Sequence, residues 1–310
     1  MSKQKHTYGP VPSRRLGLSL GIDIIPFKTC SFNCIYCQLG RTTNKTIERK
    51  AYVTTAELLT ELQAVLKDNN QIDYITFSGS GEPTLNSEIG QMIREIKRIT
   101  STPVAVLTNS SLLSQESVQD DLLSADLVIP SLDSVTAGTF QKINRPYNGI
   151  EISQVIEGLK DFSQKFNGKI WLEIMLVEGV NNGPDELTRI RDTVKQIKLD
   201  RIQLNTVIRP PSEELVRPLE SHEMLRIKKL LGRKCEVIGE FDRRAKEVYK
   251  EDIEPKIMDI IKRRPVTVLD ISLLLGIHLT EAIKILRTLE GEHKVGSTTV
   301  RNRRFYHSIH

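Results

Sequence analysis

The 310-residue sequence has few aromatic residues and few cysteines: aromatics make up 5% of the chain, with one Trp, and there are four Cys. No stretch approaches the roughly 20 consecutive apolar residues of a membrane-spanning helix, which argues against a helical membrane protein. The first fifteen residues, MSKQKHTYGPVPSRR, contain no apolar core of the kind a secretory signal needs. We therefore expect a cytoplasmic protein without a membrane partner, whose thiols stay reduced.

Neither sign of charge dominates, since 44 Lys and Arg stand against 39 Asp and Glu, a net charge of +5. Residues 249–310 hold 11 basic and 8 acidic residues and so contribute +3 of that total. A basic segment is compatible with a polyanionic partner such as nucleic acid, but an excess this small is also typical of an ordinary solvated surface. Charge alone leaves both interpretations open.

Short apolar runs rich in β-branched residues alternate with segments of helical period from residue 18 to about residue 240. The runs predict strands at 18–25, 74–78, 104–108, 127–132, 170–177 and 201–207. The segments between and after them predict helices at 54–67, 87–99, 114–123, 150–166, 184–197 and 221–231. Strands that are apolar on both faces are typical of a parallel sheet covered by helices. The sequence therefore predicts an α/β fold, a partial (β/α)6 barrel over residues 1–248, with its chemistry at the carboxyl ends of the strands.

A charged segment poor in large apolar residues, 241–254, separates this body from a tail with a different pattern. The tail, residues 249–310, predicts helices at 255–262, 268–275 and 280–290, followed by a hairpin at 294–306. We place the turn of this hairpin at Gly296-Ser297. Three helices followed by a β-ribbon are typical of a small winged helix-turn-helix domain.

The predicted wing carries three arginines, Arg301, Arg303 and Arg304, beside Phe305 and Tyr306. Guanidinium groups next to aromatic rings suit the phosphates and bases of RNA, so tRNA is one candidate partner. Docking of the wing on a protein partner or on the main body is the alternative.

Three of the four cysteines fall within eight residues, Cys30, Cys34 and Cys37, in the loop that follows the first predicted strand. A structural zinc site normally needs a fourth ligand, and a lone distant cysteine such as Cys235 is more typical of a small buried apolar residue. A thioredoxin-like redox pair would use Cys34 and Cys37 and leave Cys30 without a role. Three thiolates instead suit a four-iron cluster in which one iron stays open for a small molecule.

The C-x3-C-x2-C loop after a first strand, with the aromatic Tyr36 before its third cysteine, resembles the hallmark of the radical S-adenosylmethionine (SAM) superfamily. The resemblance implies that the three cysteines bind a [4Fe-4S] cluster, that SAM binds at its open iron, and that Tyr36 lies beside the cofactor. Gly79, Gly81 and Glu82 follow the second strand in a segment similar to the one that contacts the methionyl amino group in this family. Glycines permit close backbone approach, and one carboxylate can pair with an ammonium there.

The ends of the later predicted strands resemble the family in the same order. Asn109 follows the third strand, and the Ser-Leu-Asp segment with Ser131 and Asp133 at the end of the fourth is similar to a ribose contact of the superfamily. Glu173 lies inside the fifth strand, where a buried carboxylate needs a partner, and this favours a position facing a cavity. Asn205, in the sixth strand, is expected to line the adenine or substrate region.

The resemblance implies an enzyme. After reduction by one electron from a flavodoxin- or ferredoxin-type donor, the cluster would cleave SAM to methionine and a 5′-deoxyadenosyl radical, which abstracts a hydrogen atom from an unidentified substrate. Segments 9–17 and 142–146 are most similar to the branch of tRNA wyosine synthases, which makes tRNA a candidate substrate. That branch carries a second cluster on further cysteines, and Cys235 alone cannot build one, so wyosine formation itself is not expected.

Other functions stay open at this point. Residues 176–181 resemble a stretch of the glycyl-radical activases, which favours an activase or another peptide- or protein-modifying radical SAM enzyme. A winged helix beside a redox cluster also suits a nucleic-acid-binding regulator that senses redox state, and such a sensor would not cleave SAM. Arg14 and Arg15 precede the first strand and are expected on the solvated surface, with contact to an anionic substrate as the alternative.

Overall fold

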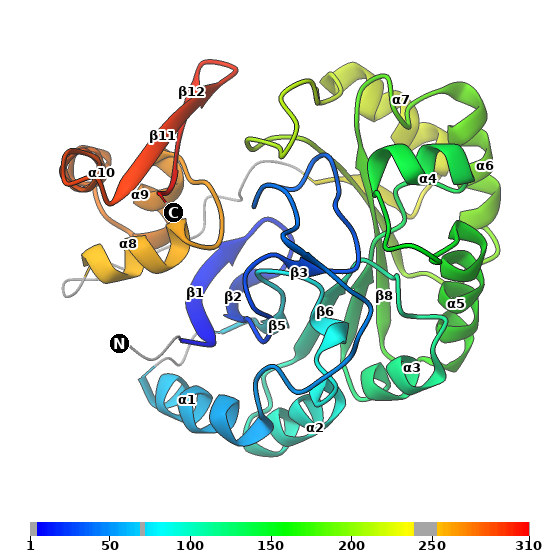
Figure 1. Cartoon of the computed structure of the whole chain (residues 1–310), viewed down its shortest axis with the longest axis horizontal. Helices are drawn as coiled ribbons and strands as arrows, with labels where there is room; N and C mark the ends of the chain where they lie inside the picture. The colour runs from blue at the N-terminus through cyan, green and yellow to red at the C-terminus, as the bar shows by residue number, and fades with distance from the viewer. Residues whose placement is uncertain (1–4, 69–71, 239–252, 310) are drawn as a thin grey trace.

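The computed structural model describes residues 5–68, 72–238 and 253–309. Its main body is one curved sheet in the order β1-β2-β5-β6-β7-β8-β9-β10 (Figure 1). β1 runs antiparallel to β2, and the strands from β2 to β10 pair in parallel. The strands are β1 (Thr7–Ser13), β2 (Gly17–Ile22), β5 (Tyr74–Phe77), β6 (Val104–Thr108), β7 (Leu127–Pro130), β8 (Lys169–Leu176), β9 (Arg201–Thr206) and β10 (Cys235–Val237). The predicted α/β fold with a parallel sheet is confirmed, as an open and not a closed barrel.

Helices follow the parallel strands and lie along the outside of the sheet (Figure 1). They are α1 (Thr55–Asp68), α2 (Ile89–Ile99), α3 (Glu116–Leu122), α4 (Ala137–Ile143), α5 (Ile152–Lys165), α6 (Pro184–Val194) and α7 (Ser221–Leu231). All the predicted helices of the body are present within a few residues of their expected bounds. Among the described residues, no helix combines the length and apolar character needed to cross a membrane.

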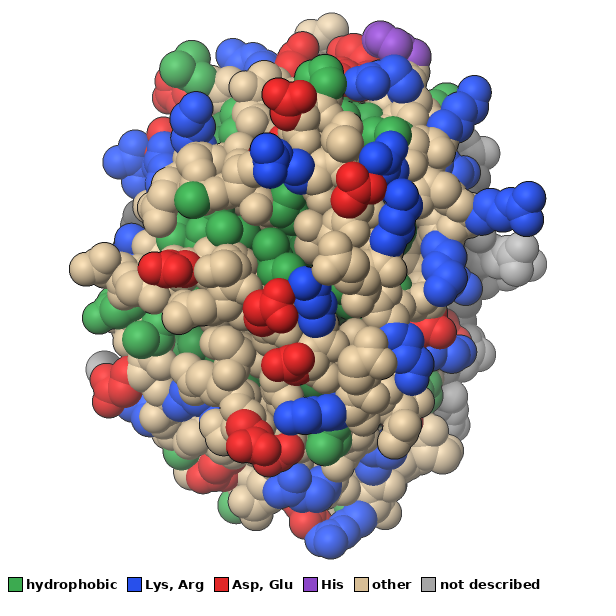
Figure 2. Space-filling model, turned by 90° about the vertical axis from the view of Figure 1, so that its right-hand side faces the viewer, with side chains coloured by type: hydrophobic (Ala, Val, Ile, Leu, Met, Phe, Trp, Pro, Cys, Tyr) green, Lys and Arg blue, Asp and Glu red, His purple; other side chains and the backbone are tan. Residues whose placement is uncertain are grey.

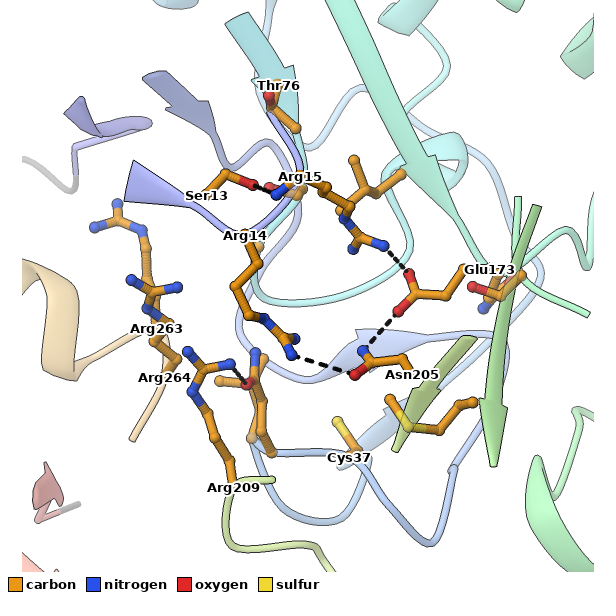
Figure 3. Close-up of a pocket in the computed structure, with 18 of the residues that line it drawn as sticks. Ser13, Arg14, Arg15, Cys37, Thr76, Glu173, Asn205, Arg209, Arg263 and Arg264 are labelled. Atoms are coloured by element: carbon orange, nitrogen blue, oxygen red, sulfur yellow. Dashed lines mark hydrogen bonds and ion pairs between the residues drawn. The ribbon is translucent and has the colours of Figure 1, made fainter. Parts of the chain in front are cut away.

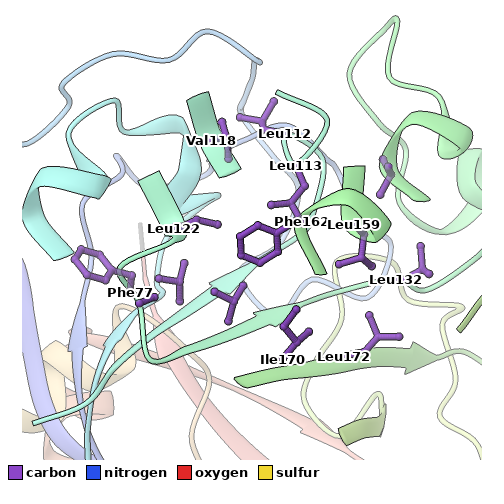
Figure 4. Packing of buried hydrophobic residues seen from close by; sticks show 14 of the residues in the cluster. Phe77, Leu112, Leu113, Val118, Leu122, Leu132, Leu159, Phe162, Ile170 and Leu172 are labelled. Atoms are coloured by element: carbon purple, nitrogen blue, oxygen red, sulfur yellow. The ribbon is translucent and has the colours of Figure 1, made fainter. Parts of the chain in front are cut away.

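The core of the body lies between the sheet and these helices. In α2 the buried residues Ile89, Met92, Ile93 and Ile96 recur at helical spacing and so share one face of the helix. Phe77 from β5 and Phe162 from α5 are fully buried in the same apolar cluster (Figure 4). This continuous apolar layer fixes the positions of the strand ends that carry the site.

The sequence did not predict six elements of the body: β1, α4, β10, the 3-10 helix η1 (Pro83–Leu85), and the two-residue strands β3 (Thr29–Cys30) and β4 (Asn44–Lys45), which pair with each other. β1 contains Gly9 and Pro10, which disfavour a strand, but it lies at the sheet edge, where a residue without an N–H is tolerated. β10 is only three residues long and adds Cys235 to the apolar core, which fits the expectation that this cysteine is a small buried residue. The first predicted strand ends at Ile22, three residues earlier than expected.

The tail contains α8 (Ile253–Ile261), α9 (Val268–Leu275), α10 (Leu279–Gly291) and an antiparallel hairpin of β11 (Val295–Val300) and β12 (Arg303–Ser308). The predicted turn at Gly296-Ser297 is wrong, because both residues pair within β11. The turn is Arg301-Asn302, whose φ angles of 49° and 60° fit a two-residue hairpin loop. The elements match the predicted domain; its assignment to the winged-helix class stays a prediction. Most of segment 241–254 lies outside the described residues.

The tail packs on the edge strand of the body, beside β1 in Figure 1. Val11 of β1 is buried in the apolar cluster of the tail, together with Ile257, Ile260 and Tyr306. The Arg263 guanidinium lies 4.4 Å from the centre of the Tyr8 ring. The unpredicted strand β1 is therefore what joins the two parts of the chain.

Candidate functional site

The carboxyl ends of the parallel strands surround a cavity of about 410 Å3 (Figure 3). This volume lies in the range of small-ligand sites. Ten of the twelve predicted site residues line it, and the other two, Cys34 and Asp133, lie directly behind lining residues. The ten are Cys30, Tyr36, Cys37, Gly79, Gly81, Glu82, Asn109, Ser131, Glu173 and Asn205.

The three clustered cysteines lie in the loop after β2, and each thiol has its own hydrogen-bond donor. Asn109 Nδ2 lies 3.4 Å from Cys30 Sγ, Asn144 Nδ2 lies 3.5 Å from Cys34 Sγ, and Lys28 Nζ lies 3.3 Å from Cys37 Sγ. Amide and ammonium donors stabilise negative charge on sulfur. The loop is therefore arranged to hold thiolates.

Burial raises the pKa of the Cys30 thiol to about 12, with a further contribution from Glu82, and burial raises the pKa of Cys34 well above its usual value. Negative charge on Asp133, Cys30 or Cys37 raises the pKa of Cys34 further, so charges on the three sulfurs would repel one another. Thiolates in this setting need a cation. Metal ions provide it, because they bind thiolate and not thiol.

A [4Fe-4S] cluster fits this donor set better than a single ion does. In the described part of the chain, no three His, Cys, Asp or Glu side chains converge closely enough to hold one metal ion. The thiolates of a four-iron cluster each bind a different iron, so they need not meet at a point. The three thiols of Cys30, Cys34 and Cys37 match this requirement, whereas Cys235, in β10, does not line the cavity.

The turn after β5 places Glu82 at the cavity wall with an exposed fraction of only 2%. Glu82 Oε1 accepts hydrogen bonds from the backbone N–H and hydroxyl of Thr84 and from the hydroxyl of Thr108, at 2.6–3.1 Å. Among the described residues, Oε2 accepts one hydrogen bond, from the Asn109 N–H at 2.7 Å. Burial raises the pKa of Glu82, and these donors oppose that shift. Oε2 thus keeps capacity for a further donor, such as an ammonium.

The two glycines of this turn are required by their surroundings. Gly79 has a φ of +140°, and a Cβ there would lie 2.5 Å from the Asp23 carboxyl carbon. A Cβ on Gly81 would lie 1.8 Å from the carbonyl oxygen of Thr29, the residue before Cys30. The glycines therefore let the turn pack directly against the cysteine loop.

Asp133 has a different position from the one expected, because it lies behind the cavity wall and not on it. Its carboxylate accepts hydrogen bonds from the Tyr36 hydroxyl, from Asn144 Nδ2 at 2.7 Å and from the Met175 N–H at 2.9 Å. Burial raises its pKa to about 6. These contacts indicate a supporting role: Asp133 holds Tyr36, which does line the cavity, and Asn144, which contacts Cys34. The expected ribose contact of Asp133 stays a prediction.

Glu173 faces the cavity from β8 and has a cationic partner. Its Oε2 lies 2.6 Å from Arg15 Nη1, and its Oε1 accepts a hydrogen bond from Asn205 Nδ2 at 2.9 Å (Figure 3). Burial alone would raise the pKa of Glu173, but Arg15, Asn205 and Arg14 outweigh it and leave the pKa lowered. The expectation that Arg14 and Arg15 lie on the solvated surface is wrong: both line the cavity, and the Arg15 side chain is 15% exposed.

Sequence reasoning missed three further arginines that line the cavity: Arg209, Arg263 and Arg264. Arg209 lies three residues after the end of β9. Its position near the carboxyl end of a parallel strand could have predicted that it lines the site. Arg263 and Arg264 follow α8 in the tail, and nothing in the sequence indicates that the tail reaches the body's cavity.

The comparisons with known proteins agree with this geometry. The family model described as Radical SAM superfamily matches residues 24–191, more than half of the chain, so the chain belongs to this superfamily. It is 35% identical over 265 residues to a UPF0026 protein of Methanocaldococcus jannaschii, a match covering 83% of this chain and 82% of that protein.

Two further matches extend the comparison. The chain is 41% identical over 296 residues to a Brachyspira hyodysenteriae protein named GTPase Obg, covering 94% of this chain but 44% of that protein, so it spans less than half of that relative's length. A radical SAM methyltransferase structure from Sphaerobacter thermophilus matches with a TM-score of 0.54 and 15% identity, over 71% of this chain and 66% of that one. This second likeness establishes the fold alone.

Proposed function

We propose that the chain is an enzyme that binds a [4Fe-4S] cluster through Cys30, Cys34 and Cys37 and uses it to cleave SAM reductively. The observation that carries the proposal is that the three thiols each have their own donor and that two of them, Cys30 and Cys37, line the same cavity as the Gly81-Glu82 turn. When bound, the reduced cluster and SAM supply a 5′-deoxyadenosyl radical for hydrogen abstraction. A one-electron donor of the flavodoxin or ferredoxin class would deliver the electron, in the cytoplasm.

The chain's own residues bind and orient the cofactor in this proposal. Glu82 accepts a hydrogen bond from the methionyl ammonium through Oε2. Ser131, Glu173 and Asn205, on neighbouring strands β7 to β9, offer hydrogen bonds to the ribose and adenine. The apolar layer behind the strands and the tail beside the cavity exclude water, which strengthens these polar contacts.

The first experiment is anaerobic reconstitution, followed by iron and sulfide analysis and an assay for 5′-deoxyadenosine with dithionite as the reductant. We expect about four irons and four sulfides per chain, and formation of 5′-deoxyadenosine that Cys30→Ser, Cys34→Ser or Cys37→Ser abolishes. Cys235→Ser is the control and should retain both cluster and cleavage. Stoichiometric zinc without sulfide contradicts the proposal, and a cluster without SAM cleavage favours the redox-sensing regulator.

The second experiment separates SAM binding from cluster assembly. Glu82→Gln should keep the iron content but weaken SAM binding by roughly 1.5–3 kcal/mol, the contribution of a hydrogen bond to a charged group. Thr84→Val is the matched control, because it removes a hydrogen bond to Oε1 only and leaves Oε2 unchanged. Calorimetric titration with SAM measures both variants. If both variants lose the same amount of SAM affinity, Glu82 only stabilises the turn and does not contact SAM.

A further inference from the structure

Four arginines from three separate segments meet on one side of the cavity (Figure 3). Arg14 follows β1, Arg209 follows β9, and Arg263 and Arg264 follow α8 in the tail. The acidic residues of the cavity lining are Glu82 and Glu173, and Glu173 is already paired with Arg15. This side of the cavity therefore carries an excess of positive charge.

Two of these arginines, Arg209 and Arg264, have a buried N–H group without a hydrogen-bond partner and without a carboxylate within ion-pair distance among the described residues. The whole Arg209 residue is only 9% exposed, and its Nε is buried with no hydrogen-bond partner among the described residues, although Nη1 donates to Gln38 Oε1 at 3.2 Å. Arg264 Nη2 is likewise buried and unpartnered. Arg14 makes one long bond of 3.3 Å, from Nη1 to Asn205 Oδ1. Buried donors of this kind are rare in proteins because each one costs free energy.

Arg263 differs from the other three, because its charge is paired with a carboxylate of the body. It donates to the carbonyl oxygens of Asp259 and Lys5 and lies 3.8 Å from the Asp23 carboxylate. Its Nε still lacks a hydrogen bond, but its charge is paired. We therefore assign Arg263 to the docking of the tail and not to ligand binding.

The charges of Arg14, Arg209 and Arg264 disfavour one another. Burial lowers the pKa of Arg209 to about 9, and the charges of Arg264 and Arg14 lower it further; burial likewise lowers the pKa of Arg14 to about 10. Asp270 is a more distant carboxylate that opposes the shifts of all three. Three guanidinium groups that line one cavity, with no carboxylate in ion-pair contact in the described part of the chain, favour binding of a multiply charged anion.

We propose that Arg14, Arg209 and Arg264 bind the phosphate group of a small phosphorylated substrate. This inference rests on the proposed function, whose substrate class it names. A phosphate monoester carries a charge near −2 and three terminal oxygens, which match three guanidinium donors, whereas one arginine fork already satisfies a carboxylate. A small molecule fits better than a nucleic-acid strand, because Arg209 is almost fully enclosed between the body and the tail.

Calorimetric titration of pyrophosphate and inorganic phosphate into the reconstituted full-length chain tests the proposal. Arg209→Gln and Arg264→Gln should each weaken pyrophosphate binding by about 10- to 100-fold, the loss expected for one charged hydrogen bond. Arg189→Gln, an exposed arginine of α6, is the matched control and should bind as the parent does. Circular dichroism and iron content confirm that each variant is folded.

Other ligands give distinct outcomes in the same assay. Absence of pyrophosphate binding by the parent overturns the proposal, as does equal binding by parent and variants. If the arginine variants lose SAM binding but bind pyrophosphate as the parent does, these arginines bind the SAM carboxylate. If the parent binds tRNA but not pyrophosphate, they bind a polymer. Either outcome overturns the phosphate proposal. The titration measures binding and needs no turnover. Pyrophosphate binding by a protein that does not cleave SAM would therefore contradict the proposed function but not the presence of a phosphate site.

Discussion

Among single residues, the pair of Arg15 and Glu173 shows most clearly how a buried charge is held at this site. The side chains are 15% and 12% exposed, and the two atoms that join them lie 2.6 Å apart. The pKa of Glu173 is lowered, so its stabilising contribution is present above the unfolded-state pKa, near 4.3, and is lost as pH falls through the folded-state value. Neutral pH therefore lies in the range where the pair stabilises the fold.

Arg15→Met should lower the free energy of unfolding by about 3 kcal/mol at pH 7, because it leaves a buried carboxylate without its cation. In this variant the pKa of Glu173 should be higher than in the parent, because Asn205 and Arg14 alone oppose the effect of burial. The deficit relative to the parent should therefore shrink as pH falls and the carboxyl becomes protonated. Urea unfolding at pH 7 and pH 5 measures both effects. Arg191→Met, in an exposed pair with Asp192, should leave stability unchanged. A deficit independent of pH would show that Arg15 acts by packing alone.

At the scale of elements, the turn after β5 and the cysteine loop behave as one unit, because Gly81 packs against the Thr29 carbonyl. Gly81→Ala should displace the backbone next to Cys30, lower the iron bound after reconstitution and cost about 1–3 kcal/mol of stability through overpacking. Gly138→Ala is the control: no atom lies near a Cβ at this position in α4, so it should be neutral or stabilising by about 0.5–1 kcal/mol. Iron analysis and urea unfolding report the two effects. Full iron content in Gly81→Ala would contradict this coupling.

The hairpin of the tail is a second element whose predicted role the contacts change. Arg304 Nη2 lies 2.6 and 2.8 Å from the two carboxylate oxygens of Glu290, and Arg301 Nη2 lies 3.5 Å from Glu220 of the body. Figure 2 shows the side of the molecule that faces away from the hairpin, the right-hand side of Figure 1, where basic and acidic side chains are both present. These arginines therefore serve internal contacts, and RNA binding through the hairpin stays an untested proposal.

We expect Arg301→Ala with Arg304→Ala to leave the salt dependence of tRNA binding unchanged, because both guanidinium groups already have carboxylate partners. Anisotropy titrations of tRNA at several salt concentrations measure the slope. A decrease of about 0.7–0.9 in the log–log slope per lost arginine would show that the hairpin does contact phosphates. Arg189→Ala serves as the control for the loss of a surface charge.

At the scale of the whole molecule, the tail completes the cavity of the body. Val11→Asp places an unpaired charge in the shared apolar cluster, where Val11 is 9% exposed, and should loosen the tail. If Arg264 is then displaced, pyrophosphate affinity should fall by about tenfold or more while iron content stays unchanged. Titration and iron analysis test this, with Leu225→Asp, an exposed position in α7, as the control. If the tail is loosened and the affinity for pyrophosphate does not change, the tail does not contribute to the binding site.

The sequence predicted those parts of the fold and the site that depend on local pattern. The apolar runs located six parallel strands, and the spacing of Cys30, Cys34 and Cys37 located the loop at their carboxyl ends. β1 was missed because Gly9 and Pro10 disfavour a strand that only its place at an edge permits. The roles of Asp133 and Arg264 depend on contacts between distant segments, which local pattern does not record.

The position of the tail over the cavity also has a consequence for the order of synthesis. Cys37 and Arg263 are 263 − 37 = 226 residues apart, which corresponds to roughly 10–45 seconds at the ribosome, at about 5–20 residues per second. During this interval the growing chain already contains the cysteine loop but not the arginines that close its far side. Under the proposed function, the thiols can thus receive a cluster before Arg263 and Arg264, which line the far side of the cavity, have been synthesised.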